Sequence, residues 1–178
     1  RITDITLPTS CTLGTVHLNN FVGCTSLKHI TALSASTEFV ADGDDTGYTV
    51  DKFLAGASSE FYFEAEDNSK THDFTKANAI PFKYADRDCY EIIKKDGLAE
   101  ITYQVDSNNN LIGFNLTGEV SVVEIPSAIG PYGISTIDSR SFSGNCFLRK
   151  IIIPATVTAI NDNAFRGCHN LEAVIFSD

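Results

Sequence analysis

Cys168 and His169 are neighbours whose side chains, a thiol and an imidazole, could act together as a nucleophile and its general base. The apolar pattern described below, however, predicts that Cys168 points into the fold and His169 away from it. The other histidines, His17, His29 and His72, show no metal-ligand spacing to one another or to His169. The sequence also lacks the G-x-S-x-G, H-E-x-x-H, P-loop and G-x-G-x-x-G motifs. We therefore expect a non-enzymatic protein without a cofactor or a metal site.

Two polar stretches have a spacing that partly fits a calcium loop. In the first, the acidic residues begin at Asp42, but the twelfth position, where an EF-hand has Glu, holds Phe53. In the second, oxygen-bearing side chains alternate over 106–110, but Leu111 stands where the loop requires Gly. The sequence therefore predicts a solvated acidic loop within 34–60 and a turn at 106–110.

The acidic residues are concentrated in one part of the chain. The formal net charge is −10, and residues 38–73 contribute −8 of it, through ten Asp and Glu against Lys52 and Lys70. This charge argues against a nucleic-acid partner, because the phosphate backbone is itself negative. No apolar run is long enough to cross a membrane, so we expect no membrane-spanning segment here.

Five cysteines, an odd number, cannot form a complete set of disulfides. Cys24 and Cys168 occupy the same inward position of the repeat described next, and Cys146 is one position late. One interpretation is that they are small apolar side chains that fill the interior. The other is a disulfide between Cys146 and Cys168, because neighbouring strands lie about 4.8 Å apart, which is within reach of a disulfide.

The elements that position these residues form a repeat, because one set of apolar residues recurs along the chain. The last copy consists of Leu148, Ile151, Ile153, Pro154, Val157, Ile160, Phe165 and Cys168. It begins again 23 residues later, at Leu171, Val174 and Phe176. The preceding copy consists of Val120, Val123, Ile125, Pro126, Ile134, Ile137 and Phe142. The first copy consists of Ile2, Ile5, Leu7, Pro8, Leu13, Val16, Phe21 and Cys24, and leads into Leu27 and Ile30. Self-similarity with a period in the twenties is typical of solenoid proteins.

The copies differ in length at one place. Phe21, Phe142 and Phe165 each precede the next Leu by six residues and follow an Ile or Val by five. After the Pro, the next apolar residue of the set follows at three, five or eight positions. Because a packed repeat accepts insertions only where the chain crosses the surface, we expect each copy to loop out after its Pro.

This pattern closely resembles the BspA-like, or Treponema-type, leucine-rich repeat family, with its L-x-x-I-x-I-P, V-x-x-I and A-F-x-x-C-x-x-L segments. Residues 148–176 match it almost letter for letter, whereas Asn20 and Ser141 replace the Ala before the Phe. The resemblance implies an α/β solenoid, mainly β, whose coils of about 23 residues contain short helical or 3-10 turns. It also implies a cell-surface or secreted, extracellular protein that mediates adhesion to a protein partner or a host surface.

The order of the expected elements divides the chain into four parts. Residues 1–37 form the end of a first repeat array, with strands at 2–7 and 27–32, a helical or 3-10 turn at 19–24, and no repeat pattern after Leu33. Residues 38–85 hold the acidic insert, a half-exposed strand at 61–66, and a helix and strand within 71–84 that loosely resemble the element closing an array in this family.

The second half begins at a boundary in 85–88. Residues 86–118 predict a three-stranded β meander with strands at 89–94, 99–105 and 111–116, because Asp-Gly and Asn-Asn are hairpin turn sequences. In the family's layout such a meander caps the start of an array. Residues 119–178 form the start of a second leucine-rich repeat array.

The outward strand positions of the second array are the candidate binding face, because repeat proteins usually bind along their row of strands. The candidate ligand-binding residues are Glu124, Arg149, Lys150, Ile152, Glu172 and Ile175. Ile152 and Ile175 should lie exposed and side by side, although single exposed apolar residues are also ordinary. We expect a binding or adhesion module. The alternatives are a structural spacer in a multidomain cell-surface protein and an accessory carbohydrate-binding domain of a secreted enzyme. The second alternative is disfavoured because the chain has no Trp and the outward strand positions considered contain no aromatic residue.

The first and last residues of the sequence lead to two expectations about the parent protein. Without an initiator Met or a signal peptide, Arg1 indicates a processed or cut fragment. Leu171–Phe176 would form an open edge strand. We therefore expect that the parent protein continues past Asp178 or that this edge strand associates with another molecule.

Overall fold

The computed structural model of the chain is mainly β with few helices and describes residues 1–9, 15–41, 49–96 and 99–178. Leu13 of the first repeat copy, the acidic residues that begin at Asp42, and Gly97 lie outside the described residues. Contacts divide the chain into two compact units, Arg1–Asp88 and Cys89–Asp178, and each is described by itself.

Parallel strands form the core of the first unit. β1 (Asp4–Leu7), β3 (His29–Ala32), β5 (Tyr62–Ala65) and β6 (Phe82–Tyr84) pair in this order. Their inward residues Ile5, Ile30, Phe63 and Phe82 form one lateral row. Ile30, Phe63 and Phe82 are almost fully buried, as their apolar, alternating positions predict.

A second parallel pair includes residues after Leu33, where the sequence shows no repeat pattern. β2 (Thr15–His17) pairs with β4 (Glu38–Val40), and Val16 lies opposite Phe39. Phe39 is buried and stands 23 positions after Val16. The repeat is hidden in the sequence because this copy has no Pro after its strand and carries an aromatic residue where the other copies have Ile or Val.

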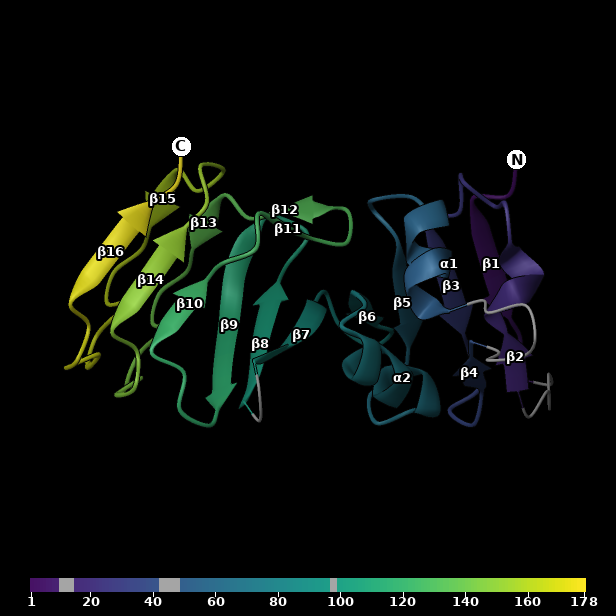
Figure 1. Ribbon diagram of the computed structural model, residues 1–178, viewed down its shortest axis with the longest axis horizontal. Coiled ribbons are helices and arrows are strands. Elements are labelled where there is room, and N and C mark those ends of the chain that lie inside the picture. Colours follow the sequence, from purple (N-terminus) through teal and green to yellow (C-terminus); the bar gives the residue numbers. More distant parts are fainter. Residues whose placement is uncertain (10–14, 42–48, 97–98) are drawn as a thin grey trace. The chain divides into compact units, whose positions relative to one another are not determined.

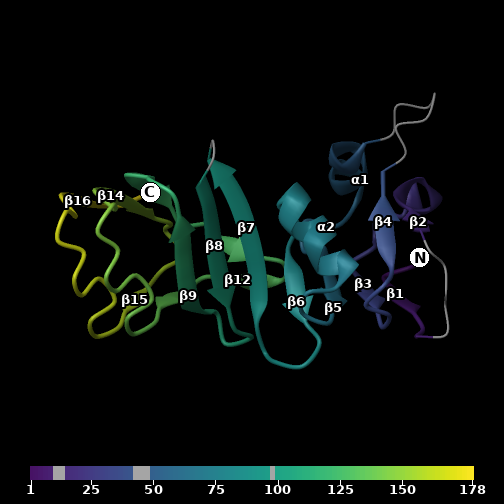
Figure 2. The same ribbon diagram turned by 90° about the horizontal axis from the view of Figure 1, so that it is seen from below.

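Two helices and a 3-10 turn complete the first unit. The expected turn is η1 (Leu18–Phe21), but Leu18, which the repeat pattern omits, is buried, whereas Phe21 is only half-buried. α1 (Val50–Gly56) lies where the sequence predicts a loop; its first turn is capped by Thr49, and Phe53 is buried against Phe61. Figure 2 shows α1 and α2 on the same side of the row β1, β3, β5 and β6.

The helix and strand expected within 71–84 are α2 (Lys70–Asn78) and β6. Ser69 caps α2 by accepting a hydrogen bond from the His72 N–H at 3.1 Å, and the helix ends at Ala79 in the left-handed conformation. The buried His72 ring stacks on Phe82 with ring centroids 4.1 Å apart. This contact holds α2 against β6.

The second unit begins with three antiparallel strands, β7 (Tyr90–Asp96), β8 (Ala99–Val105) and β9 (Asn110–Thr117). They occupy the segment for which the sequence predicts a meander. In the turn between β8 and β9, the Asp106 carboxylate accepts hydrogen bonds from the backbone N–H groups of Asn108 and Asn110. Its oxygens are used within the turn, as in an Asx turn, which agrees with the expected turn rather than with a calcium loop.

The second unit also contains two parallel ladders. β10 (Val122–Glu124), β14 (Lys150–Ile153) and β16 (Ala173–Phe176) form one, in which Val123, Ile151 and Val174 lie side by side. β9, β13 (Thr136–Ile137) and β15 (Ala159–Ile160) form the other. Figure 1 shows β10, β14 and β16 in a row, and Figure 2 shows β14 and β16 on one side of the unit and β15 on the other.

The long segment after Pro126 forms a loop with its own structure. It contains β11 (Ala128–Ile129) and β12 (Tyr132–Gly133), which pair as an antiparallel hairpin. The insertion therefore leaves the β10 ladder undisturbed, as its position after the Pro predicts.

The turn after each repeat Phe has the same backbone conformation. Gly23, Gly144 and Gly167, each two residues after its Phe, all have φ +78°, which residues with a side chain rarely adopt. Phe142 is fully buried, and its ring stacks on the half-buried Phe165.

The cysteines neither form the disulfide considered in the sequence analysis nor are all buried in the interior. Cys146 is exposed, and Cys24 and Cys168 are only half-buried. No disulfide joins Cys146 to Cys168. Instead, the Cys168 thiol donates to the Phe142 carbonyl at 3.0 Å, and the Cys146 thiol donates to the Gly144 carbonyl at 3.4 Å. The expectation of buried, space-filling side chains is therefore wrong for Cys146.

Candidate functional site

The strand register places three of the six candidate binding residues in one row across the ladder. Glu124 lies opposite Ile152, and Ile152 lies opposite Ile175. All three point outward, because their neighbours Val123 and Ile151 are the buried residues of the same strands. Ile175 is 41% exposed, but Ile152, between two neighbours, is half-buried.

A second row lies beside the first. Lys150 pairs with Val122 on one side and with Ala173 on the other. Val122 is 48% exposed, although the sequence analysis does not include it among the candidates. The V-V-E alternation of β10 could have identified it, because Val122 and Glu124 must share a face of the strand. We call these two rows the strand face: Val122, Glu124, Lys150, Ile152, Ala173 and Ile175.

The two predicted basic residues differ in their partners. Arg149 forms an ion pair with Glu172 at 3.1 Å, and both side chains are more than half exposed. Such a pair stabilises the fold by little. Lys150 makes no ion pair within the described residues, so its ammonium group is the free cation of the strand face.

The last strand exposes residues that the repeat pattern places inside. Val174 and Phe176 are 41% and 60% exposed, whereas Ile151 and Ile153, their counterparts in β14, are fully buried. Val174 and Phe176 lie on the opposite face of β16 from Ile175, so this apolar surface is separate from the row of Ile152 and Ile175.

Aromatic residues reach the surface outside the outward strand positions considered in the sequence analysis. In the first unit, Tyr62 points outward from β5 and stacks on His29, with ring centroids 5.2 Å apart and planes 7° from parallel. In the second unit, Phe147 is 54% exposed. The repeat pattern misses both, because Tyr62 lies in a copy that it does not detect and Phe147 lies between its defined positions.

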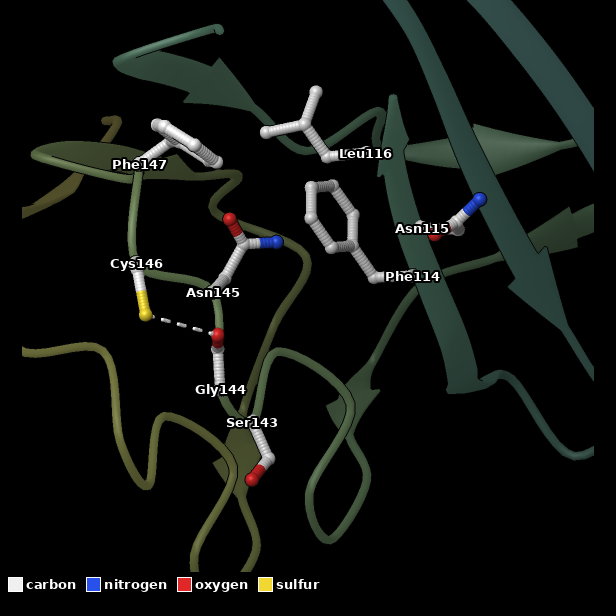
Figure 3. A pocket seen from close by; sticks show the side chains of 8 residues that line it. All are labelled: Phe114, Asn115, Leu116, Ser143, Gly144, Asn145, Cys146 and Phe147. Carbon is white, nitrogen blue, oxygen red and sulfur yellow. Dashed lines mark hydrogen bonds between the residues drawn. The ribbon is translucent and has the colours of Figure 1, made fainter. Parts of the chain in front are cut away.

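Phe147 lies at two pockets of the second unit. The first, of about 350 Å³, lies between β9 and the turn after Phe142, and is lined by Phe114, Asn115, Leu116, Ser143, Gly144, Asn145, Cys146 and Phe147 (Figure 3). The second, of about 320 Å³, is lined by Glu119, Val120, Ser121, Phe147 and Arg149. Phe147 therefore lines both a pocket without charged side chains and a pocket that is also lined by Arg149, a predicted binding residue.

The thiol and imidazole considered above form no catalytic pair. Burial raises the pKa of the Cys168 thiol, which disfavours the thiolate that a nucleophile needs. The thiol donates to a backbone carbonyl, and the neighbouring His169 is exposed. This arrangement agrees with a structural role for Cys168.

Within the described parts of the chain, no three His, Cys, Asp or Glu side chains lie close enough together to hold a metal ion. None of the helices described in the structure is long and apolar enough to span a membrane.

A protein-family match agrees with the repeat pattern. Residues 94–178 match the family described as "BspA type Leucine rich repeat region (6 copies)". Among solved structures, the chain is similar to a leucine rich cell surface protein from Faecalibacterium prausnitzii A2-165, with 14% identity and a TM-score of 0.40, over 99% of this chain and 70% of that one. No curated protein matches the chain. Residues 94–178 therefore carry the leucine-rich repeat of the BspA type.

Proposed function

We propose that the chain is a non-enzymatic recognition module that presents the strand face of β10, β14 and β16 to a protein partner. In this proposal the successive copies stack as a solenoid with coils of about 23 residues. The spacing of 23 between the laterally paired Ile151 and Val174 supports this arrangement. The family match supports the class of function, because repeat proteins of this kind generally bind other proteins.

The observation that carries the proposal is the composition of the strand face. One row is aliphatic at Ile152 and Ile175 and acidic at Glu124, and the adjacent row centres on the free ammonium group of Lys150. An apolar centre beside polar groups is the usual arrangement of a protein-binding surface. The chemistry fits a partner that offers an apolar side chain to Ile152 and a carboxylate to Lys150.

We place this module outside the cell, at the cell surface or in a secreted protein. This location follows from the resemblance to the BspA-like family, and so does a role in adhesion. A structural spacer that only holds other domains apart would need no such exposed face.

The test is a double substitution on the strand face. Beads that carry the purified chain are allowed to attach to surfaces coated with a panel of host matrix proteins. The variant Lys150→Glu/Ile152→Thr should lose attachment, because it reverses the free cation and removes the central apolar contact. The matched control is Ile112→Thr/Lys95→Glu, which makes the same changes at an exposed Ile on β9 and an exposed Lys on β7.

The control should attach as well as the unchanged chain. Equal attachment of both variants, or no attachment of the unchanged chain to any coated surface, would favour the spacer and contradict the proposal.

A further inference from the structure

The turn after the repeat Phe occurs three times, and the middle copy departs from the other two. The copies are Gly23–Ser26, Gly144–Phe147 and Gly167–Asn170. The three glycines share φ +78°, and the N–H of the residue after each glycine donates to the carbonyl of the repeat Phe, so the side chains of the three turns can be compared position by position. The last position is Ser26 or Asn170 in the outer copies and Phe147 in the middle one.

A structural role explains Asn170 but not Phe147. The Asn170 side-chain amide donates to the Cys146 carbonyl of the preceding copy at 2.6 Å. Phe147 has no donor for such a bond, and 54% of its surface is exposed. The middle copy thus has an exposed aromatic ring where the last copy has a side chain that donates a hydrogen bond to its neighbour.

The second departure lies two residues earlier, in the same turn. Asn145 occupies the position of Cys24 and Cys168. Cys168 uses its side chain within the fold, by donating to the Phe142 carbonyl. The Asn145 side-chain amide makes no hydrogen bond within the described part of the chain, so its two N–H donors and its carbonyl oxygen remain available.

The two unusual side chains meet in one pocket. Figure 3 shows the Asn145 amide between the Phe147 side chain and the side chains of Phe114 and Leu116, which point toward the turn from β9, while Asn115 points away. The Phe114 ring is held from behind by Phe142, with ring centroids 4.4 Å apart. The pocket therefore has a fixed apolar wall, an exposed aromatic wall and a free amide between them.

The lining defines the chemical class of the ligand. None of the lining residues carries a charged side chain, so the pocket suits neither a metal ion nor a phosphate. Its volume of about 350 Å³ is near the lower limit for ligand pockets and fits a small ring rather than a protein loop. A neutral saccharide combines an apolar ring face, which packs on an aromatic ring, with hydroxyl groups that match the amide's donors and acceptor.

We propose that this pocket binds a neutral saccharide residue, with one face of the sugar ring on Phe147 and its hydroxyl groups on the Asn145 amide. The proposal goes beyond protein recognition by the strand face and does not depend on it. It assigns a ligand to the exposed aromatic residue that the sequence analysis did not find.

The test is titration of the isotope-labelled chain with neutral monosaccharides and disaccharides, followed by NMR. At least one saccharide should shift the Asn145 side-chain amide and the Phe147 ring signals. Phe147→Asn and Asn145→Cys introduce the residues found in the last copy of the turn, so the fold should tolerate them. Each should weaken saccharide binding by at least about tenfold. Phe147→Leu keeps an apolar side chain but removes the flat ring. It should also weaken saccharide binding.

The matched control is Val22→Asn, which removes an exposed apolar side chain from the turn of the first copy, outside both the pocket and the strand face. It should leave saccharide binding unchanged. The proposal is overturned if no neutral saccharide shifts these signals, if the shifts lie elsewhere, or if neutral peptides produce them and saccharides do not. These outcomes are independent of attachment to matrix proteins, so failure here leaves the strand-face proposal intact.

Discussion

The rings of Phe142 and Phe165, 23 residues apart in the sequence, stack with their centroids 5.2 Å apart and their planes inclined by 25°. The Phe142 N–H also donates to the Ala164 carbonyl, and the Gly144 N–H to the Arg166 carbonyl. Each copy of the repeat is thus held by the next copy through both side chains and backbone. Equivalent substitutions in successive copies should therefore lower the free energy of unfolding by different amounts.

Phe142→Ala should lower the free energy of unfolding by about 3–5 kcal/mol, because it removes a fully buried ring from a packed interior. Phe165→Ala should cost less than half as much, since Phe165 is half-buried. Urea unfolding followed by circular dichroism measures both. Equal costs, or a larger cost at Phe165, would show that the two rings do not lie in the environments described.

The Tyr103 hydroxyl connects the antiparallel strands to the first strand of the ladder. It donates to the Glu124 carbonyl at 2.9 Å, and burial raises the pKa of Tyr103 well above its usual range, which keeps the hydroxyl protonated. Tyr103→Phe should therefore cost about 1–2 kcal/mol of unfolding free energy, because the carbonyl loses its donor. Thermal unfolding measures the loss, with Tyr132→Phe as the control. No loss at Tyr103 would mean that this hydrogen bond does not hold β8 to β10.

Asp106 makes the turn between β8 and β9 sensitive to acid. Although burial alone raises its pKa, hydrogen bonds from Asn110 and Asn108 outweigh this effect and hold the pKa of Asp106 below its usual value. A carboxyl group with a lowered pKa stabilises the fold above its unfolded-state pKa of about 3.9, and this stability is lost as the pH falls through the folded-state pKa.

Asp106→Ala should therefore destabilise the chain at pH 7 by about 1 kcal/mol and have a progressively smaller effect below about pH 4. The melting temperatures of the unchanged chain and of Asp106→Ala, measured between pH 7 and pH 3, test this prediction. A difference that is the same at pH 7 and pH 3 would contradict the assigned hydrogen bonds.

The two neighbouring cysteines should differ in reactivity. Cys146 is exposed, whereas burial raises the pKa of the half-buried Cys168 and lowers its thiolate fraction at neutral pH. Iodoacetamide should therefore alkylate Cys146 faster than Cys168 in the folded chain, as followed by peptide mass spectrometry. The unfolded chain is the control, in which both rates should become similar. Faster alkylation of Cys168 in the folded chain would contradict its hydrogen bond to Phe142.

Apolar spacing predicted much of the second unit. The row Val123, Ile151 and Val174 follows from the repeat alone, and so does the location of the hairpin β11–β12 after Pro126. The outward row Glu124, Ile152 and Ile175 follows in turn, because residues alternate sides along a strand.

Other features depend on contacts that spacing does not contain. Phe39 pairs with Val16 although its copy has lost the Pro, and α1 is held by burial of Phe53 within a segment of loop-like composition. The pocket at Phe147 forms only because β9 packs beside the turn after Phe142. Interpretation of a repeat from its apolar residues alone therefore misses side chains that lie between the repeat positions.

The most direct test of the central claim, that the strand face recognises a protein partner, is NMR chemical-shift mapping. The labelled 19.3 kDa chain is titrated with the members of the matrix-protein panel. The account predicts that a binding partner shifts the signals of Glu124, Lys150, Ile152 and Ile175 most strongly. Largest shifts outside the strand face, or no shifts with any panel member, would contradict it.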